Sequence, residues 1–165
     1  MPRLQFRQAT PDDAAAVLAV KRAAIRELTG DHYADAQVDA WAPDDDALPS
    51  FEAAIESDRF TVLLAETDGE TVGYGVLNGA AGRIDAAYVH PDHARDGIAT
   101  SLVGQLETRA GMRDIDELDV VASLNAVPFY ESLGYWRLDT EPRDIGGVDV
   151  DFTVMRKRLD ADEPG

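Results

Sequence analysis

The chain of 165 residues and 17.9 kDa has the size of one compact domain, and its 45 % of apolar residues is enough to bury a core. It contains no cysteine, which excludes a disulfide framework, a cysteine-ligated zinc site and a thiol nucleophile. Its 32 acidic residues against 15 basic ones give a net charge of −17, which argues against binding to a nucleic-acid backbone.

The first third of the chain predicts a strand followed by helices. Residues 4–9 alternate between apolar and polar side chains, as a strand does. Thr10 and Pro11 then form a helix start, and Gly30 is expected to end that helix. Residues 31–57 predict a looser helical stretch, which prolines and an acidic run interrupt.

The middle of the chain predicts an antiparallel meander. Residues 60–66, 71–77 and 83–89 each favour a strand, and Asp68-Gly69 is a typical two-residue hairpin turn. The apolar period then changes from 2 to 3.6. This change predicts a helix with Ile98, Leu102, Leu106 and Ala110 on its buried face.

The last third predicts a strand at 118–122, a short helix capped by Asn125, and strands at 135–138 and 148–156 around a turn at Gly146-Gly147. The element order is β-α-α-β-β-β-α-β-α-β-β. It predicts a mixed, mostly antiparallel sheet of six or seven strands with helices on both faces, in which strands 83–89 and 118–122 are parallel neighbours. We expect one domain over residues 1–159 and a disordered acidic tail at 160–165.

The segment from Tyr88 to Leu102 is the best candidate for a ligand site. A strand ends there, a loop crosses over, and a helix begins near Gly97. Free N–H groups at such a helix start favour an anion, above all a phosphate. An ordinary strand-to-helix turn is the alternative. His90 and His93 have no helical spacing and no evident third ligand, so no metal site is expected.

Two motifs in this region resemble the GCN5-related N-acetyltransferase (GNAT) superfamily. Val89-His90-Pro91-Asp92-His93-Ala94-Arg95-Asp96-Gly97-Ile98-Ala99 is similar to the family's acetyl-CoA pyrophosphate loop, Arg/Gln-x-x-Gly-x-Gly/Ala. Asn125-Ala126-Val127-Pro128-Phe129-Tyr130-Glu131-Ser132-Leu133-Gly134-Tyr135 is similar to its second signature, with a one-residue difference in spacing. The resemblance covers roughly residues 3–158. The sequence departs from the family's motif at Ala94, where Arg or Gln is usual, and at Arg95, which replaces the first glycine.

The resemblance implies a set of residues that contact acetyl-CoA. They are Tyr88, Val89, Ala94, Arg95, Asp96, Gly97, Ile98, Ala99, Thr100, Asn125 and Tyr130. It also implies a splay between strands 83–89 and 118–122, into which the pantetheine arm fits. Arg95 is the candidate to replace the cation missing at Ala94.

By the same resemblance, Tyr130 matches the tyrosine that protonates the sulfur of coenzyme A, and its alternative role is a core aromatic. The family's usual position for a general base is Arg83 here, which cannot accept a proton. Asp85 is then the candidate base, with Glu66 or a water chain as alternatives. Tyr33 and Trp41 fall where the family's acceptor pocket lies, or else they only anchor a helix to the core.

The expected function is transfer of an acetyl group from acetyl-CoA to a primary amine of a small molecule or peptide, by direct attack in a ternary complex and without metal. A non-catalytic acyl-CoA-binding or regulatory domain is the alternative. The expected partners are acetyl-CoA and the amine acceptor, with neither nucleic acid nor a membrane, and a homodimer is left open.

The acidic surface has its own interpretation. Only two of the basic residues are lysines, Lys21 and Lys157, and the acids are spread along the whole chain. Such a surface is typical of a protein that works in concentrated salt, where charges repel each other over only about 3 Å at 1 M. We therefore expect a halophilic origin, and a cytoplasmic location because the N-terminus lacks a signal peptide.

Overall fold

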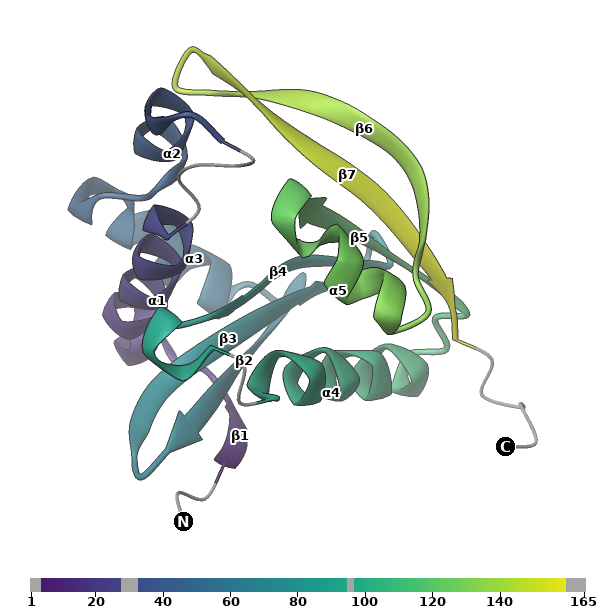
Figure 1. Cartoon of the computed structure of the whole chain (residues 1–165). Coiled ribbons are helices and arrows are strands. Elements are labelled where there is room, and N and C mark those ends of the chain that lie inside the picture. Colours follow the sequence, from purple (N-terminus) through teal and green to yellow (C-terminus); the bar gives the residue numbers. More distant parts are fainter. Residues whose placement is uncertain (1–3, 28–32, 95–96, 160–165) are drawn as a thin grey trace.

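The computed structural model describes residues 4–27, 33–94 and 97–159, and its elements follow the predicted order (Figure 1). The strands are β1 (Leu4–Gln8), β2 (Phe60–Thr67), β3 (Glu70–Asn78), β4 (Arg83–Val89), β5 (Glu117–Ser123), β6 (Trp136–Ile145) and β7 (Val148–Arg158). The α-helices are α1 (Ala14–Arg26), α2 (Asp35–Trp41), α3 (Leu48–Glu56), α4 (Ile98–Met112) and α5 (Val127–Ser132). Short 3₁₀ turns at Pro11–Asp13, Asp45–Ala47 and Leu124–Ala126 lead into α1, α3 and α5, and another at Pro91–His93 follows β4.

The strands form one sheet in the order β1-β2-β3-β4-β5-β7-β6. Neighbouring strands are antiparallel except β4 and β5, which are parallel as predicted. The turns expected at Asp68-Gly69 and Gly146-Gly147 join β2 to β3 and β6 to β7. All four turn residues have positive φ, the conformation that a type I′ hairpin turn requires. The predicted fold class is confirmed.

Helices cover both faces of the sheet (Figure 1). Strand side chains alternate between the core clusters on the two faces. On β2, Leu63 lies in the core cluster that contains Leu106 of α4. Its neighbour Leu64 lies in the cluster that contains Val17 of α1. This alternation follows from the two-residue period of a strand. It fixes α1 and α4 on opposite faces, where both pack against β4.

One strand is longer than predicted. β6 spans Trp136–Ile145 instead of residues 135–138, and it pairs with β7 along its length. Pro142 and the charged residues around it lack the alternation of a half-buried strand, which is why the pattern missed them. Because β6 is the last strand of the sheet, Pro142 removes no hydrogen bond from a neighbour on its outer edge.

The predicted cap of the short helix is wrong. Asn125 lies inside the 3₁₀ turn Leu124–Ala126, so that Ala126 occupies the N-cap position of α5 and makes no side-chain cap hydrogen bond. Pro128 lies in the first turn of α5, as predicted. The extra turn leaves the Asn125 side chain exposed and available to a ligand.

The first helix, α1, ends at Arg26 with Glu27 as its C-cap, whereas Gly30, predicted to end it, and the predicted disordered tail at 160–165 lie outside the described residues. The domain boundary at residue 159 therefore stays a prediction. Across the described ranges, none of the helices combines the length and the apolar character that a membrane span needs.

Candidate active site

The parallel strands β4 and β5 separate after a short contact. They pair at Arg83↔Asp119 and Ile84↔Val120, and beyond this point β4 follows β3 while β5 follows β7. One edge of Asp85–Val89 thus has no strand partner among the described residues, and its N–H and C=O groups face the gap. The predicted splay is present. Residues 85–88, 120–123, Ala126 and Tyr130 line the hollow within it, here termed the splay opening.

The loop after β4 leads to the N-terminus of α4. Gly97 has a φ of +79°, a left-handed conformation that favours glycine, and α4 begins at the next residue. The first N–H groups of a helix have no acceptor within it, so this end of α4 suits an anion. Ala94, Gly97, Ala99 and Thr100 line a hollow here, the loop pocket, together with Val89, His93, Ile98 and Phe129. Arg95 and Asp96 lie outside the described residues.

The hollows form a continuous row along the end of β4. The loop pocket shares Val89 and Ala94 with the next hollow, the strand-end cleft, which Asn125 and Ala126 line from the opposite side. This cleft shares Ala126 and Tyr88 with the splay opening. A long, narrow ligand with an anionic end fits such a row, with the anion at α4 and the other end between β4 and β5.

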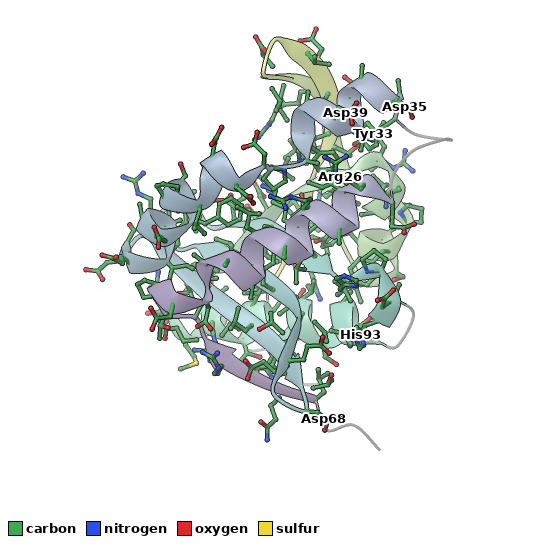
Figure 2. All side chains as sticks on the ribbon, turned by 90° about the vertical axis from the view of Figure 1, so that its left-hand side faces the viewer. Arg26, Tyr33, Asp35, Asp39, Asp68 and His93 are labelled. Atoms are coloured by element: carbon green, nitrogen blue, oxygen red, sulfur yellow. The ribbon has the colours of Figure 1, made fainter. Side chains whose placement is uncertain are left out.

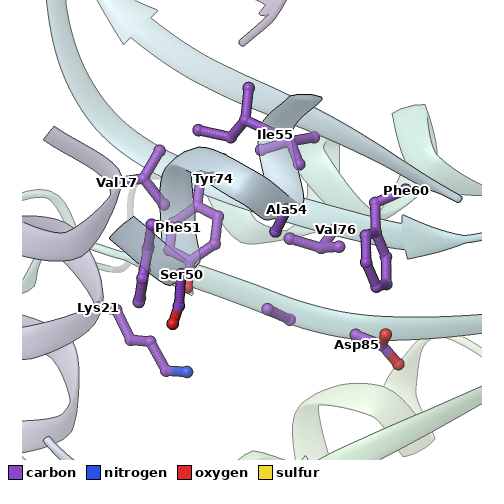
Figure 3. Close-up of a pocket in the computed structure, with 12 residues that line it drawn as sticks. Val17, Lys21, Ser50, Phe51, Ala54, Ile55, Phe60, Tyr74, Val76 and Asp85 are labelled. Carbon is purple, nitrogen blue, oxygen red and sulfur yellow. The ribbon is translucent and has the colours of Figure 1, made fainter. Parts of the chain in front are cut away.

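Two further hollows continue the row toward α1. The polar cavity shares Asp85, Tyr88 and Val121 with the splay opening; its other lining residues are Lys21, Trp41, Arg83, Arg143, Asp144, Ile145 and Phe152. The apolar pocket shares Lys21 and Asp85 with the polar cavity (Figure 3). Its other lining residues are Val17, Ser50, Phe51, Ala54, Ile55, Phe60, Val62, Tyr74, Val76 and Ala86. A second ligand placed in these hollows would meet the end of the first at the splay opening.

Tyr130 reaches the splay opening from α5. Its side chain is 4 % exposed and packs against the rings of Phe129 and Tyr135, with centroids 5.0 and 5.5 Å away. Burial raises the pKa of the Tyr130 hydroxyl above its ordinary value, because the phenolate would lose its hydration. A tyrosine hydroxyl is protonated at neutral pH and burial reinforces this, so Tyr130 is a candidate proton donor at the opening.

Asp85 lies where three hollows meet, since it lines the splay opening, the polar cavity and the apolar pocket. The Arg83 guanidinium pairs with one of its oxygens, and Asn78 Nδ2 lies 3.4 Å from the other. Glu66, the alternative base, pairs instead with Arg7 at 3.0 Å and lines none of these hollows. Of the two carboxylates, only Asp85 is positioned to meet a ligand there.

The two aromatic residues predicted for the acceptor pocket, Tyr33 and Trp41, pack against each other with ring centroids 5.4 Å apart, but of the two only Trp41 lines one of these hollows. Trp41 lines the polar cavity and packs against the rings of Tyr88 and Phe152. Tyr33 is 2 % exposed, and its hydroxyl donates to the Asp151 carbonyl at 2.6 Å and accepts from the Leu124 N–H at 2.9 Å. Tyr33 thus ties the chain before α2 to β7 and to the end of β5. It lies near the junction of α1 and α2, where Arg26 pairs with Asp39 (Figure 2).

Several lining residues escaped the sequence analysis. Lys21 and Arg143 bring positive charge to the polar cavity, Phe152 supplies an aromatic wall, and Ser123 and Ala126 border the splay. Ala126 lies within the second motif, but Lys21, Arg143, Phe152 and Ser123 come from α1, the β6–β7 hairpin and the end of β5, so no local motif groups them. The one signal in the sequence was the rarity of lysine, because Lys21 is one of only two in the chain.

Within the described ranges, no three or more His, Asp or Glu side chains gather closely enough to hold a metal ion. His90, half of the histidine pair considered above, uses its Nδ1 to accept the Asp92 N–H within the loop.

The sheet order, with its one parallel pair and with helices on both faces, is that of an acyl-transferring enzyme. The model of the acetyltransferase (GNAT) domain family matches residues 29–159. The chain belongs to this family, and the prediction of an acetyl-CoA-dependent N-acetyltransferase is confirmed.

Similar proteins support the assignment. The crystal structure of a GCN5-related N-acetyltransferase from Rhodopseudomonas palustris is 35 % identical, has a TM-score of 0.87 and is matched over 96 % of each chain. The uncharacterized N-acetyltransferase YafP of Escherichia coli K12 is 28 % identical over 82 % of this chain and 83 % of its own. PaiA N-acetyltransferase from Thermoplasma acidophilum, solved with coenzyme A, shares the fold at 17 % identity, with a TM-score of 0.75 over 94 % and 99 % of the two chains. YncA from Salmonella typhimurium, solved with acetyl-CoA, has a TM-score of 0.68 at 22 % identity over 96 % and 95 %.

Proposed function

We propose that this protein transfers the acetyl group of acetyl-CoA to a primary amine by direct attack, with both substrates bound at once and no metal. The observation that carries the proposal is the splay of β4 from β5. It joins the anion-binding start of α4 to the hollows beside α1, so that two ligands can meet end to end.

The residues of the row fit coenzyme A by their chemistry. The helix start at Gly97 offers N–H groups to the pyrophosphate, and the free edge of β4 at Tyr88 and Val89 offers hydrogen bonds to the pantetheine amides. Exposed Asn125 lines the cleft on the other side. Two relatives of the same fold bind coenzyme A or acetyl-CoA, which supports this assignment.

Catalysis then rests on three groups of this chain. A backbone N–H of β4 near Tyr88 polarises the thioester carbonyl, and the amine nitrogen forms a bond to the carbonyl carbon. As the carbon–sulfur bond breaks, the protonated hydroxyl of Tyr130 gives its proton to the sulfur. Asp85 takes the surplus proton of the amine, directly or through water; exchange with solvent then removes this proton from Asp85 and restores the one that Tyr130 gave up. The products are the acetamide and free coenzyme A.

Calorimetry in high potassium chloride tests the first half of the proposal. Acetyl-CoA should bind, and a broad panel of amines should then release thiol. Lack of binding at millimolar acetyl-CoA would overturn the proposed function. Binding without thiol release from any amine would favour the alternative of a non-catalytic acyl-CoA-binding domain. The halophilic origin, the cytoplasmic location and the homodimer stay predictions.

Trp41→Ala tests the acceptor side. Trp41 is 7 % exposed, so its truncation should lower the free energy of unfolding by about 3–5 kcal/mol. Because Trp41 lines the polar cavity and not the loop pocket, the KM of the acceptor should rise at least tenfold while the KM of acetyl-CoA changes little. Steady-state kinetics well below the melting temperature measure both.

Trp136→Ala is the matched control, since Trp136 is the other tryptophan and is 44 % exposed on β6. It should alter neither KM. An equal rise of both KM values in Trp41→Ala would assign Trp41 a purely structural role.

A further inference from the structure

The polar cavity reverses the charge of the rest of the protein. Three of its lining residues are cations, Lys21, Arg83 and Arg143, and two are carboxylates, Asp85 and Asp144, a sum of +1. The whole chain carries −17. The net positive charge of this cavity cannot be explained by the acidic surface of the protein. It therefore indicates that the cavity binds an anionic group.

Lys21 is the most unusual of these residues. It is half-buried on α1 and makes no ion pair with any described acidic residue, whereas the other lysine, Lys157, pairs with Glu107 at 3.1 Å. Its ammonium lies 5.7 Å from the ring centre of Phe51 and 5.8 Å from that of Tyr88. Burial lowers the pKa of Lys21, and no neighbouring carboxylate offsets this effect within the described residues. A desolvated, unpaired cation beside a site is a ready partner for an anionic ligand.

Arg143 brings a second unpaired cation from the β6–β7 hairpin. Its guanidinium lies 6.0 Å from the ring centre of Phe152, at the exposed rim of the same cavity, and no ion pair joins it to a described carboxylate. The other charges are already engaged, because Arg83 pairs with Asp85 and Asp144 accepts the Gly147 N–H at 2.8 Å. Lys21 and Arg143 therefore remain for a ligand.

The apolar pocket adds the third feature. It has a volume of about 260 Å³, and apart from Lys21, Ser50 and Asp85 its lining side chains are aliphatic or aromatic. Figure 3 shows Lys21 and Asp85 along one edge of this pocket, with Ile55 on the opposite edge. A ligand held there would place an apolar group among these side chains and its charged groups at the edge shared with the polar cavity.

We infer that the acceptor is a free α-amino acid with an apolar side chain, whose carboxylate binds Lys21 and Arg143. This inference rests on the proposed function and names the class of its acceptor. The side chain of the amino acid occupies the apolar pocket. Its amino group, on the same carbon as the carboxylate, lies at Asp85 beside the splay opening. A peptide N-terminus lacks a carboxylate at this position and would leave both cations unpaired.

Matched acceptors test the inference. L-Leucine and 3-methylbutylamine differ only in the carboxylate, so kcat/KM for leucine should be at least tenfold higher. L-Leucinamide, which mimics a peptide end, should also be at least tenfold poorer than leucine. L-Alanine, which cannot fill the apolar pocket, should be poorer than leucine as well. Equal kcat/KM for leucine and 3-methylbutylamine would overturn the inference while leaving the proposed function intact.

Lys21→Met keeps the length of the side chain and removes its charge. It should lower the leucine to 3-methylbutylamine ratio at least tenfold, and Arg143→Gln should lower it by a smaller factor because Arg143 is exposed. Arg158→Gln is the matched control, because Arg158 is exposed at the far end of β7, where it lines none of the hollows. It should leave the ratio unchanged. An unchanged ratio in Lys21→Met would exclude this lysine as the carboxylate partner.

An equilibrium measurement separates this inference from the proposed function. Calorimetry with the protein saturated with coenzyme A should show tighter binding of N-acetyl-L-leucine than of N-(3-methylbutyl)acetamide, and Lys21→Met should abolish the difference. If no amine is acetylated but this preference is present, the site for a carboxylate stands and the reaction does not. If amines are acetylated and the preference is absent, the reaction stands and the inference is wrong.

Discussion

Tyr130→Phe should lower kcat by about 10²–10⁴-fold and leave the KM of acetyl-CoA nearly unchanged. The size of the effect is that of a missing general acid. Tyr130 lines the splay opening, and burial raises the pKa of its hydroxyl further above neutral pH, so the loss of this hydroxyl leaves the departing thiolate without the proposed proton donor. The loop pocket and the strand-end cleft, which we assign to the cosubstrate's phosphates and pantetheine, keep their lining. Thiol release under saturating substrates measures kcat.

Tyr135→Phe is the control for this experiment. Tyr135 lies 5.5 Å from Tyr130 between ring centres, is 3 % exposed and donates its hydroxyl to Glu107 at 2.8 Å. It lines none of the hollows, so the same change there should cost about 1–3 kcal/mol of stability and leave kcat within a fewfold. If both variants lost kcat equally, the effect of Tyr130→Phe would be one of packing and the proposed proton donor would be wrong.

The parts of the fold that were predictable from the sequence are those that local chemistry determines. Asp68-Gly69 and Gly146-Gly147 adopt positive φ as hairpin turns do, and the buried face of α4 follows the 3.6-residue period. The splay of β4 from β5 was expected only through the resemblance to a family. No residue pattern in either strand reveals that their pairing stops after Ile84.

The missed features depend on tertiary contacts. β6 is a strand although Pro142 and its charged neighbours disfavour one, because its partner β7 supplies the hydrogen bonds. Lys21 and Arg143 are 122 positions apart in the chain and meet at one cavity only after α1 and the β6–β7 hairpin take their places. Periodicity and spacing along the chain cannot report such a pair.

Leu106→Ala should cost about 2–5 kcal/mol in the free energy of unfolding, the usual range for a buried leucine that leaves a cavity. Leu106 is fully buried on α4, in the core cluster with Leu63 and Ile84. Its place in the fold explains Gly75 of β3, because a Cβ there would lie 2.7 Å from Leu106 Cδ1. Urea unfolding at a constant potassium chloride concentration measures the change. Leu138→Ala, at a leucine that is 44 % exposed on β6, should cost less than about 0.5 kcal/mol.

The contact with Gly75 allows a sharper form of this test. Gly75→Ala should destabilise the wild-type protein, because Leu106 or the strand must move to admit the methyl group. In the Leu106→Ala background the obstructing atom is gone, so the same substitution should cost less there. The two changes are therefore expected to be non-additive. The double variant should lose less free energy of unfolding than the two single variants lose together. Strict additivity would mean that α4 does not pack on β3 through this pair. The start of α4, where the loop pocket lies, would then depend on other contacts for its position.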